Sequence, residues 1–186
     1  KFSIPWSKPA INSDEQNAVN DVFKSGWFSQ GKITQKFEKN LSQYFSSNAT
    51  VVNNGTSAII CALLAHGIKP GDSVIVPDFT FFATFSAAKI LGANVILADI
   101  DKKNFNLNPD TVKKIVQKEK VKYVIPVDIA GVPIDIQKFE ELSEKYDFIL
   151  IEDAAQALGS EYNHQIIGSF NHTSTFSFHI AKQITT

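Results

Sequence analysis

Apolar and polar positions follow two rhythms along the chain, and each rhythm predicts one kind of element. Short apolar runs bounded by turn residues, such as residues 73–76 and 148–151, are typical of buried strands. Between such runs the apolar positions recur every three or four residues, as in Ile33, Phe37, Leu41 and Tyr44, which predicts an amphipathic helix. The chain is therefore expected to alternate strands and helices.

The pattern predicts six strands and six helices. The strands are expected at residues 50–53, 73–76, 94–98, 122–127, 148–151 and 175–178, and the helices from residue 13, over 33–44, 56–66 and 81–91, from residue 109, and after residue 135. Ser13 with Gln16 resembles a capping box, Asn108 before Pro109 is a start signal, and Asp135 is a third cap. The alternation predicts an α/β fold of three layers, α/β/α, with a mainly parallel sheet.

The composition of the chain argues against several classes of protein. The chain has 186 residues, 44% of them hydrophobic and 20% charged, with a formal net charge of -1, so it is expected to be globular and not a nucleic-acid binder. It has no apolar run near the ~20 residues of a membrane span. One cysteine, Cys61, forms no internal disulfide and fits a cytoplasmic location. The four scattered histidines have no metal-ligand spacing, so no metal is expected.

Residues directly after the strands of an open α/β sheet are the first candidates for a site, because ligands bind beyond the carboxyl ends of such strands. After the first regular strand come Gly55, Thr56 and Ser57 at the start of a helix. Free N–H groups, the helix dipole and two hydroxyls favour a phosphate there. The alternative is ordinary N-capping by Asn54 or Thr56.

Three further groups follow strands in the same way. Phe81 belongs to an aromatic cluster, in which one ring could stack on a flat heterocycle, although core packing is the ordinary role of such rings. Glu152 and Asp153 follow a strongly apolar strand, and a buried carboxylate there could pair with a protonated ring nitrogen, cap a helix or bind a metal. Ser177 could donate to a phosphate. Lys182 is either a surface residue or a desolvated amine that forms Schiff bases.

Together these groups supply a phosphate cradle, a stacking ring, a carboxylate for a ring nitrogen and a reactive amine. That set is what a site for pyridoxal 5'-phosphate (PLP) requires.

The sequence resembles the PLP-dependent sugar aminotransferases of the DegT/StrS group, which have the aspartate aminotransferase fold (fold type I). The resemblance covers nearly the whole chain. Its motifs are Ser25-Gly26-Trp27, Gly31, Phe37-Glu38, Asn54-Gly55-Thr56-Ser57-Ala58, Pro70-Gly71-Asp72, Thr80-Phe81-x-Ala83-Thr84, Asp128-x-Ala130-Gly131-x-Pro133-x-Asp135, Glu152-Asp153-Ala154-Ala155-Gln156-Ala157, and Phe176-Ser177-Phe178-His179 with Lys182 and Thr185-Thr186.

The resemblance implies a role for each matching residue. Lys182 would hold PLP covalently and move a proton, Asp153 would pair with the pyridine nitrogen, Gln156 would lie beside the ring, and Phe81 would stack on it. The phosphate would be bound by Gly55, Thr56, Ser57 and Ser177. Two departures, Ile180 for proline and Asn171 for glycine, fall outside these chemical positions.

The resemblance also implies an activity. The protein is expected to transfer an amino group, from glutamate, to a nucleotide-linked keto-sugar for polysaccharide or sugar-metabolite biosynthesis, as a homodimer with shared sites. Relatives that act as dehydratases carry histidine at the lysine position, so Lys182 favours transamination. A dehydratase, a non-catalytic relative and a plain α/β domain remain alternatives. Residues 1–186, which contain no methionine, are expected to be an incomplete large domain without the smaller C-terminal domain.

Overall fold

The computed structural model describes residues 7–186, which divide into two compact units. The first unit combines the N-terminal part of the chain, up to Val51, with Phe178–Thr186. The second unit is Val52–Ser177 and contains the sheet. No helix among the described residues is both long and apolar enough to cross a membrane.

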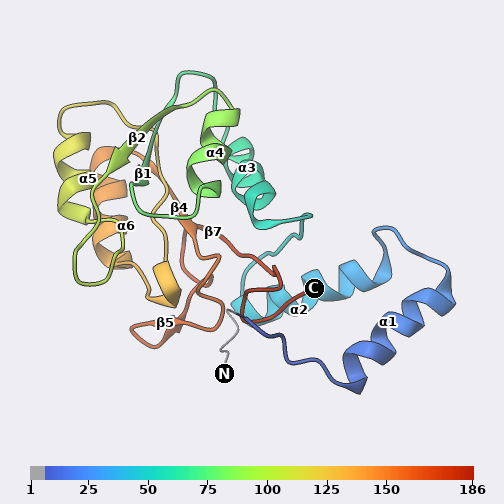
Figure 1. Cartoon of the computed structure of the whole chain (residues 1–186). Helices are drawn as coiled ribbons and strands as arrows, with labels where there is room; N and C mark the ends of the chain where they lie inside the picture. The colour runs from blue at the N-terminus through green and yellow to red at the C-terminus, as the bar shows by residue number, and fades with distance from the viewer. Residues whose placement is uncertain (1–6) are drawn as a thin grey trace, which may run out of the picture. The chain divides into compact units, whose positions relative to one another are not determined.

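The second unit is built on a five-stranded sheet in the order β2-β1-β3-β4-β7 (Figure 1). All four neighbouring pairs in this sheet are parallel. The strands are β1 (Ser73–Pro77), β2 (Asn94–Ala98), β3 (Tyr123–Val124), β4 (Ile149–Asp153) and β7 (Thr173–Thr175). A separate antiparallel hairpin, β5 (Glu161–Tyr162) with β6 (Gln165–Ile166), completes the strands of this unit, and η1 (Ile129–Gly131) is a short 3₁₀ turn.

Helices cover both faces of the sheet, because neighbouring residues of each strand point to opposite sides. On β1, Val74 and Val76 belong to one buried cluster and Ile75 to the other. The first cluster lies under α3 (Gly55–Ala65) and α4 (Ala83–Ile90), and the second lies under α5 (Pro109–Val116) and α6 (Ile136–Tyr146). This arrangement confirms the expected three-layer α/β/α fold.

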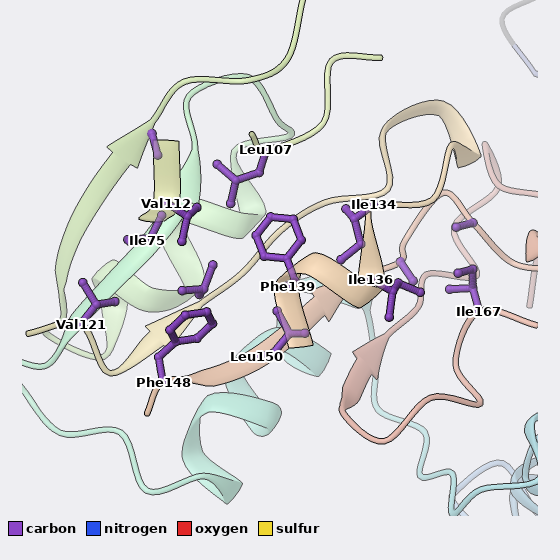
Figure 2. Close-up of a cluster of buried hydrophobic side chains, with 14 residues drawn as sticks. Ile75, Leu107, Val112, Val121, Ile134, Ile136, Phe139, Phe148, Leu150 and Ile167 are labelled. Atoms are coloured by element: carbon purple, nitrogen blue, oxygen red, sulfur yellow. The ribbon is translucent and has the colours of Figure 1, made fainter. Parts of the chain in front are cut away.

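Figure 2 shows the cluster under α5 and α6. The rings of Phe139 and Phe148 lie among the aliphatic side chains of Val112, Leu107 and Leu150. Phe139 is fully buried, and a buried phenylalanine of this kind contributes about 3–5 kcal/mol relative to alanine. The core therefore fixes α6 against β4, the strand that ends at Asp153.

The first unit contains α1 (Ser13–Ser25) and α2 (Lys32–Phe45). The cap predicted for α1 is wrong by one residue: Asn12, not Ser13, is the N-cap, and Glu15 completes the capping box. Asn12 is an equally good cap residue and lies in extended backbone directly before Ser13, the first helical residue. The capping box is therefore shifted by one residue from the predicted one. In α2, Phe37 contacts Phe178 edge to face at 5.2 Å.

Three strand predictions need correction. Residues 50–53 form no strand, since the N–H of Val51 donates to the carboxylate of Glu38 at 3.0 Å instead of to a neighbouring strand. The strand predicted at 122–127 is only Tyr123–Val124. The last strand is Thr173–Thr175, not 175–178, because the edge of the sheet tolerates a polar strand that pairs with Ile151–Asp153.

Candidate active site

The carboxyl ends of β1, β4 and β7 lie at the same edge of the sheet because the strands are parallel. Asp153 is the last residue of β4, and Ser177 follows β7 by two residues. The N-terminus of α3 comes to the same place, since Gly55 contacts Ser177. Within the second unit, the fold therefore brings a carboxylate, a hydroxyl and a helix N-terminus to one edge.

Asp153 is a buried carboxylate that accepts hydrogen bonds from Thr84 and Ala155. The residue is only 5% exposed to solvent. The hydroxyl of Thr84 donates to Oδ2 at 2.7 Å, and the N–H of Ala155 donates to Oδ1 at 3.2 Å. Both bonds favour the charged form and fix its orientation. No helix begins directly after Asp153, and the described residues contain no group of three His, Cys, Asp or Glu side chains that could hold a metal ion.

Thr84 links this carboxylate to the aromatic segment before α4. Its hydroxyl also lies 3.3 Å from the carbonyl oxygen of Phe81, and its N–H donates to the same oxygen at 3.2 Å. Phe81 itself is 74% exposed, so its ring is not part of the core. A large apolar side chain at this exposure, fixed three residues from the partner of Asp153, is available to cover a flat ligand.

Sequence reasoning placed Thr84 in a motif but gave it no role. The sequence alone offers little indication of a role for Thr84, because a threonine in the first turn of a helix usually hydrogen-bonds to the backbone of that helix. Its partner is 69 residues away in the chain, so the contact with Asp153 appears only in the folded structure.

The start of α3 is capped by Asn54, whose side chain accepts the N–H of Ser57 at 2.8 Å, which confirms the capping alternative for Asn54. The first N–H groups of a helix have no partner within the helix, which is why helix N-termini favour anions. Thr56 and Ser57 are half-buried in this turn.

Gly55 permits close approach at this point. A Cβ built on Gly55 lies 3.2 Å from Cβ of Ser177 and 3.5 Å from its hydroxyl oxygen. Any side chain would therefore fill the space between α3 and the segment after β7. The absence of a side chain at Gly55 lets the Ser177 hydroxyl approach the N-terminus of α3.

Gln156 occupies the turn that follows β4. Its Oε1 accepts the N–H of Ala130 at 2.8 Å, and a Cβ on Gly131 would lie 3.0 Å from its carbonyl oxygen. The glutamine therefore fixes the turn around η1 next to the end of β4. Its expected place beside a bound ring stays a prediction.

Lys182 belongs to the first unit. It is half-buried, and its N–H donates to the carbonyl oxygen of His179 at 2.7 Å in a tight turn. It follows Ser177 by five residues in the chain. Its position relative to Asp153 stays a prediction.

A second group of ionisable side chains lies on the other face of β4. Glu152 points to the side opposite Asp153, because neighbouring strand residues alternate. Its Oε2 accepts the hydroxyl of Ser174 at 2.7 Å and lies 3.2 Å from Nε2 of His172. Burial lowers the pKa of His172, but hydrogen bonds and charge from Glu152 and Glu140 outweigh burial and raise it. Sequence reasoning missed this group because its members come from three separate elements.

Comparison with known proteins agrees with this architecture. Residues 9–186 match the model of the DegT/DnrJ/EryC1/StrS aminotransferase family. A putative sugar aminotransferase, Spr1654 from Streptococcus pneumoniae, solved in its PMP form, is 33% identical with a TM-score of 0.92, and the match covers 99% of this chain and 50% of that one.

Two other solved structures extend the comparison. An aminotransferase from Psychrobacter cryohalolentis is 32% identical with a TM-score of 0.91, covering 100% of this chain and 47% of that one. DesV from S. venezuelae, solved with a ketimine intermediate, is 31% identical with a TM-score of 0.88, covering 93% and 47%. The chain thus spans about half the length of the solved structures that it matches. On this evidence, the chain belongs to the DegT/DnrJ/EryC1/StrS aminotransferase family.

Proposed function

We propose that the full-length protein is a PLP-dependent aminotransferase that transfers an amino group from glutamate to a nucleotide-linked keto-sugar. The observation that carries the proposal is the convergence, at one sheet edge, of the buried Asp153 carboxylate with the Gly55–Ser177 contact at the N-terminus of α3. Structures similar to this chain include Spr1654 from Streptococcus pneumoniae, a putative sugar aminotransferase solved in both PMP and PLP forms. That likeness supports the cofactor and the substrate class.

The residues of the site fit the cofactor. A phosphate group is suited to the first turn of α3, where the Cβ-free Gly55 leaves room beside the Ser177 hydroxyl. Thr56 and Ser57 add hydroxyl donors there. A cationic ring nitrogen is suited to Asp153, because a positive charge stabilises a buried carboxylate and Thr84 and Ala155 fix the orientation of this one.

The cofactor, when bound, supplies an electron sink for the carbon that exchanges the amino group. Asp153 would keep a proton on the ring nitrogen through its negative charge. Phe81 would cover the ring face and exclude water from it, and Gln156 would lie beside the ring. Lys182 would hold the cofactor through Nζ and would move a proton to and from the reacting carbon, as a desolvated lysine can.

The proposal also names the setting of the whole protein. We expect a cytoplasmic homodimer whose sites are shared between subunits, acting in the synthesis of cell-surface polysaccharides or sugar metabolites. The exposed thiol of Cys61 accords with a reducing compartment.

A spectral titration of the full-length protein tests the proposal. Addition of PLP is expected to produce a visible absorption band of the covalently linked cofactor, and addition of glutamate is expected to convert that band to the amine form. A keto-sugar nucleotide should then restore the first band. Lys182→Ala should give no band. Lys118→Ala, at an exposed position distant in sequence from Lys182, should behave as the wild type does.

Two results count against the proposal. No band with the folded wild type would remove the cofactor assignment and leave a non-catalytic relative or a plain α/β domain. A band that no amino donor converts would contradict transamination and favour a dehydratase.

A further inference from the structure

Two buried carboxylate oxygens on the α6 side of β4 have no hydrogen-bond donor among the described residues. They are Oδ2 of Asp128 and Oε1 of Glu152, and both residues are 0% exposed. The two carboxyl groups lie within hydrogen-bonding reach of each other. Two carboxylates cannot satisfy each other while both are ionised, because each only accepts. One proton shared between them gives both oxygens a partner.

We infer that Asp128 is a neutral carboxylic acid whose O–H donates to Oε1 of Glu152, and that this carboxyl pair positions Asp153 for the cofactor. The second half of the inference rests on the proposed function. In this arrangement Asp128 is a positioning residue and contacts neither cofactor nor substrate.

The contacts of the two groups decide which one carries the proton. Glu152 already has the hydroxyl of Ser174 at 2.7 Å and the ring of His172 at 3.2 Å as partners at Oε2. Asp128 accepts only the N–H of Ile134, at 2.9 Å on Oδ1. The less stabilised charge is the one that is neutralised, so the proton resides on Asp128.

The charges around Asp128 act in the same direction. Burial and the neighbouring Glu152 raise the pKa of Asp128 to about 9, and Asp153 adds a smaller effect of the same sign. His172 lies between Glu152 and the partly exposed Glu140, and both glutamates raise its pKa despite its burial. The pair therefore holds one negative charge, beside a ring whose protonated form these carboxylates favour.

The pair reaches Asp153 through the backbone. The N–H of Asp128 donates to the carbonyl oxygen of Asp153 at 3.1 Å, and the N–H of Asp153 donates to the carbonyl oxygen of Pro126 at 2.9 Å. Glu152 directly precedes Asp153 on β4. A bond between the side chains of Asp128 and Glu152 therefore also holds the peptide that joins Glu152 to Asp153. A neutral Asp128 also leaves Asp153 without a further negative charge beside it.

Infrared spectroscopy of the full-length protein without cofactor tests the pair. The difference spectrum between wild type and Asp128→Asn at pH 7 is expected to contain the C=O stretch of one protonated carboxyl, which shifts in D₂O and disappears on unfolding. Asp128→Asn keeps both contacts, because its amide donates to Glu152 and its oxygen accepts from Ile134. Asp110→Asn, at an exposed aspartate, should show no such band. Absence of the band in the Asp128 difference spectrum overturns the inference.

The pH dependence of stability is a second measurement. The folded pKa of Asp128 is raised, so the folded state holds a proton that the unfolded chain releases above its own pKa of about 4. The folding constant of the wild type relative to Asp128→Asn should then fall up to about tenfold per pH unit between pH 5 and 9. Equal pH slopes for wild type and variant contradict a protonated Asp128.

A spectroscopic readout tests the positioning role. Asp128→Ala, which loses the donor to Glu152, should weaken PLP binding by about tenfold, as expected for one lost charge-assisted hydrogen bond, and Asp128→Asn should restore it. Above pH 9 the wild type should release PLP more readily than Asp128→Asn. If PLP binds at Lys182 of the wild type, and if Asp128→Ala binds PLP as tightly as Asp128→Asn does, the positioning role is wrong. If PLP fails to bind while the infrared band is present, the proposed function fails and the carboxyl pair stands.

Discussion

Thr84 on α4 donates its hydroxyl proton to Oδ2 of Asp153 at the end of β4, over 2.7 Å and across 69 residues of sequence. Both residues are buried, and the bond is the side-chain link between the helix that follows β1 and the carboxylate of the candidate site. It sets the orientation of Asp153 before any ligand arrives.

Thr84→Val therefore tests a contact that preorganises the site. Valine keeps the shape of threonine but removes the donor, so the buried carboxylate of Asp153 loses its hydrogen bond from this hydroxyl. The free energy of unfolding should fall by about 1.5–3 kcal/mol, the usual range for a hydrogen bond to a charged group, measured by urea denaturation. Thr84→Ser keeps the hydroxyl and is the control. Equal losses in the two variants would assign the effect to packing and not to the bond with Asp153.

Gly55→Ala tests the phosphate cradle. The added methyl would lie 3.2 Å from Cβ of Ser177, so the two segments must separate by a few tenths of an ångström. PLP affinity, measured by absorption titration, should fall by about tenfold, as for one weakened charge-assisted bond. Stability should change by less than about 1 kcal/mol, because alanine is the better helix residue.

Cys61→Ala, at an exposed position on the same helix, is the matched control for Gly55→Ala and should bind PLP as the wild type does. Unchanged affinity in Gly55→Ala would contradict a phosphate site at the start of α3.

His172 predicts a separate pH effect. Burial lowers its pKa, but Glu152 and Glu140 outweigh burial and the net shift is upward from 6.5. The protonated ring is therefore favoured by folding: its contribution to stability is complete below pH 6.5 and is lost as the pH rises through the raised pKa. In an Asp128→Asn background, His172→Asn should flatten the fall in unfolding free energy above pH 6.5, measured by denaturation at each pH. Parallel curves would show that His172 is neutral throughout.

The helices were predictable where their start signals are local. Asn108 before Pro109 and Asp135 before α6 cap their helices as expected, because a cap needs only the next three residues. The failures come from long-range pairing. Residues 50–53 were expected to form a strand, but a strand exists only if a neighbour pairs with it, and Val51 bonds to Glu38 instead. The last strand is polar, and its register with β4 is set by the sheet.

The candidate site was predictable to a similar extent. A parallel sheet gathers its carboxyl ends, so the residues after the strands could be predicted to lie near one another, and Gly55 does lie against Ser177 beside the strand that ends at Asp153. Their roles in binding stay predictions. The supporting residues were not identifiable. Thr84, Asp128 and His172 act through partners 69, 24 and 20 residues away, and nothing in their local sequence marks those contacts.

The central proposal is that Lys182 is the residue that carries PLP. Its most direct measurement is borohydride reduction of the full-length protein with PLP, followed by peptide mapping by mass spectrometry. The account predicts one modified peptide, with the cofactor on Lys182, and a loss of labelling in Lys182→Ala. Labelling of another lysine, or of none in folded protein saturated with PLP, would contradict it.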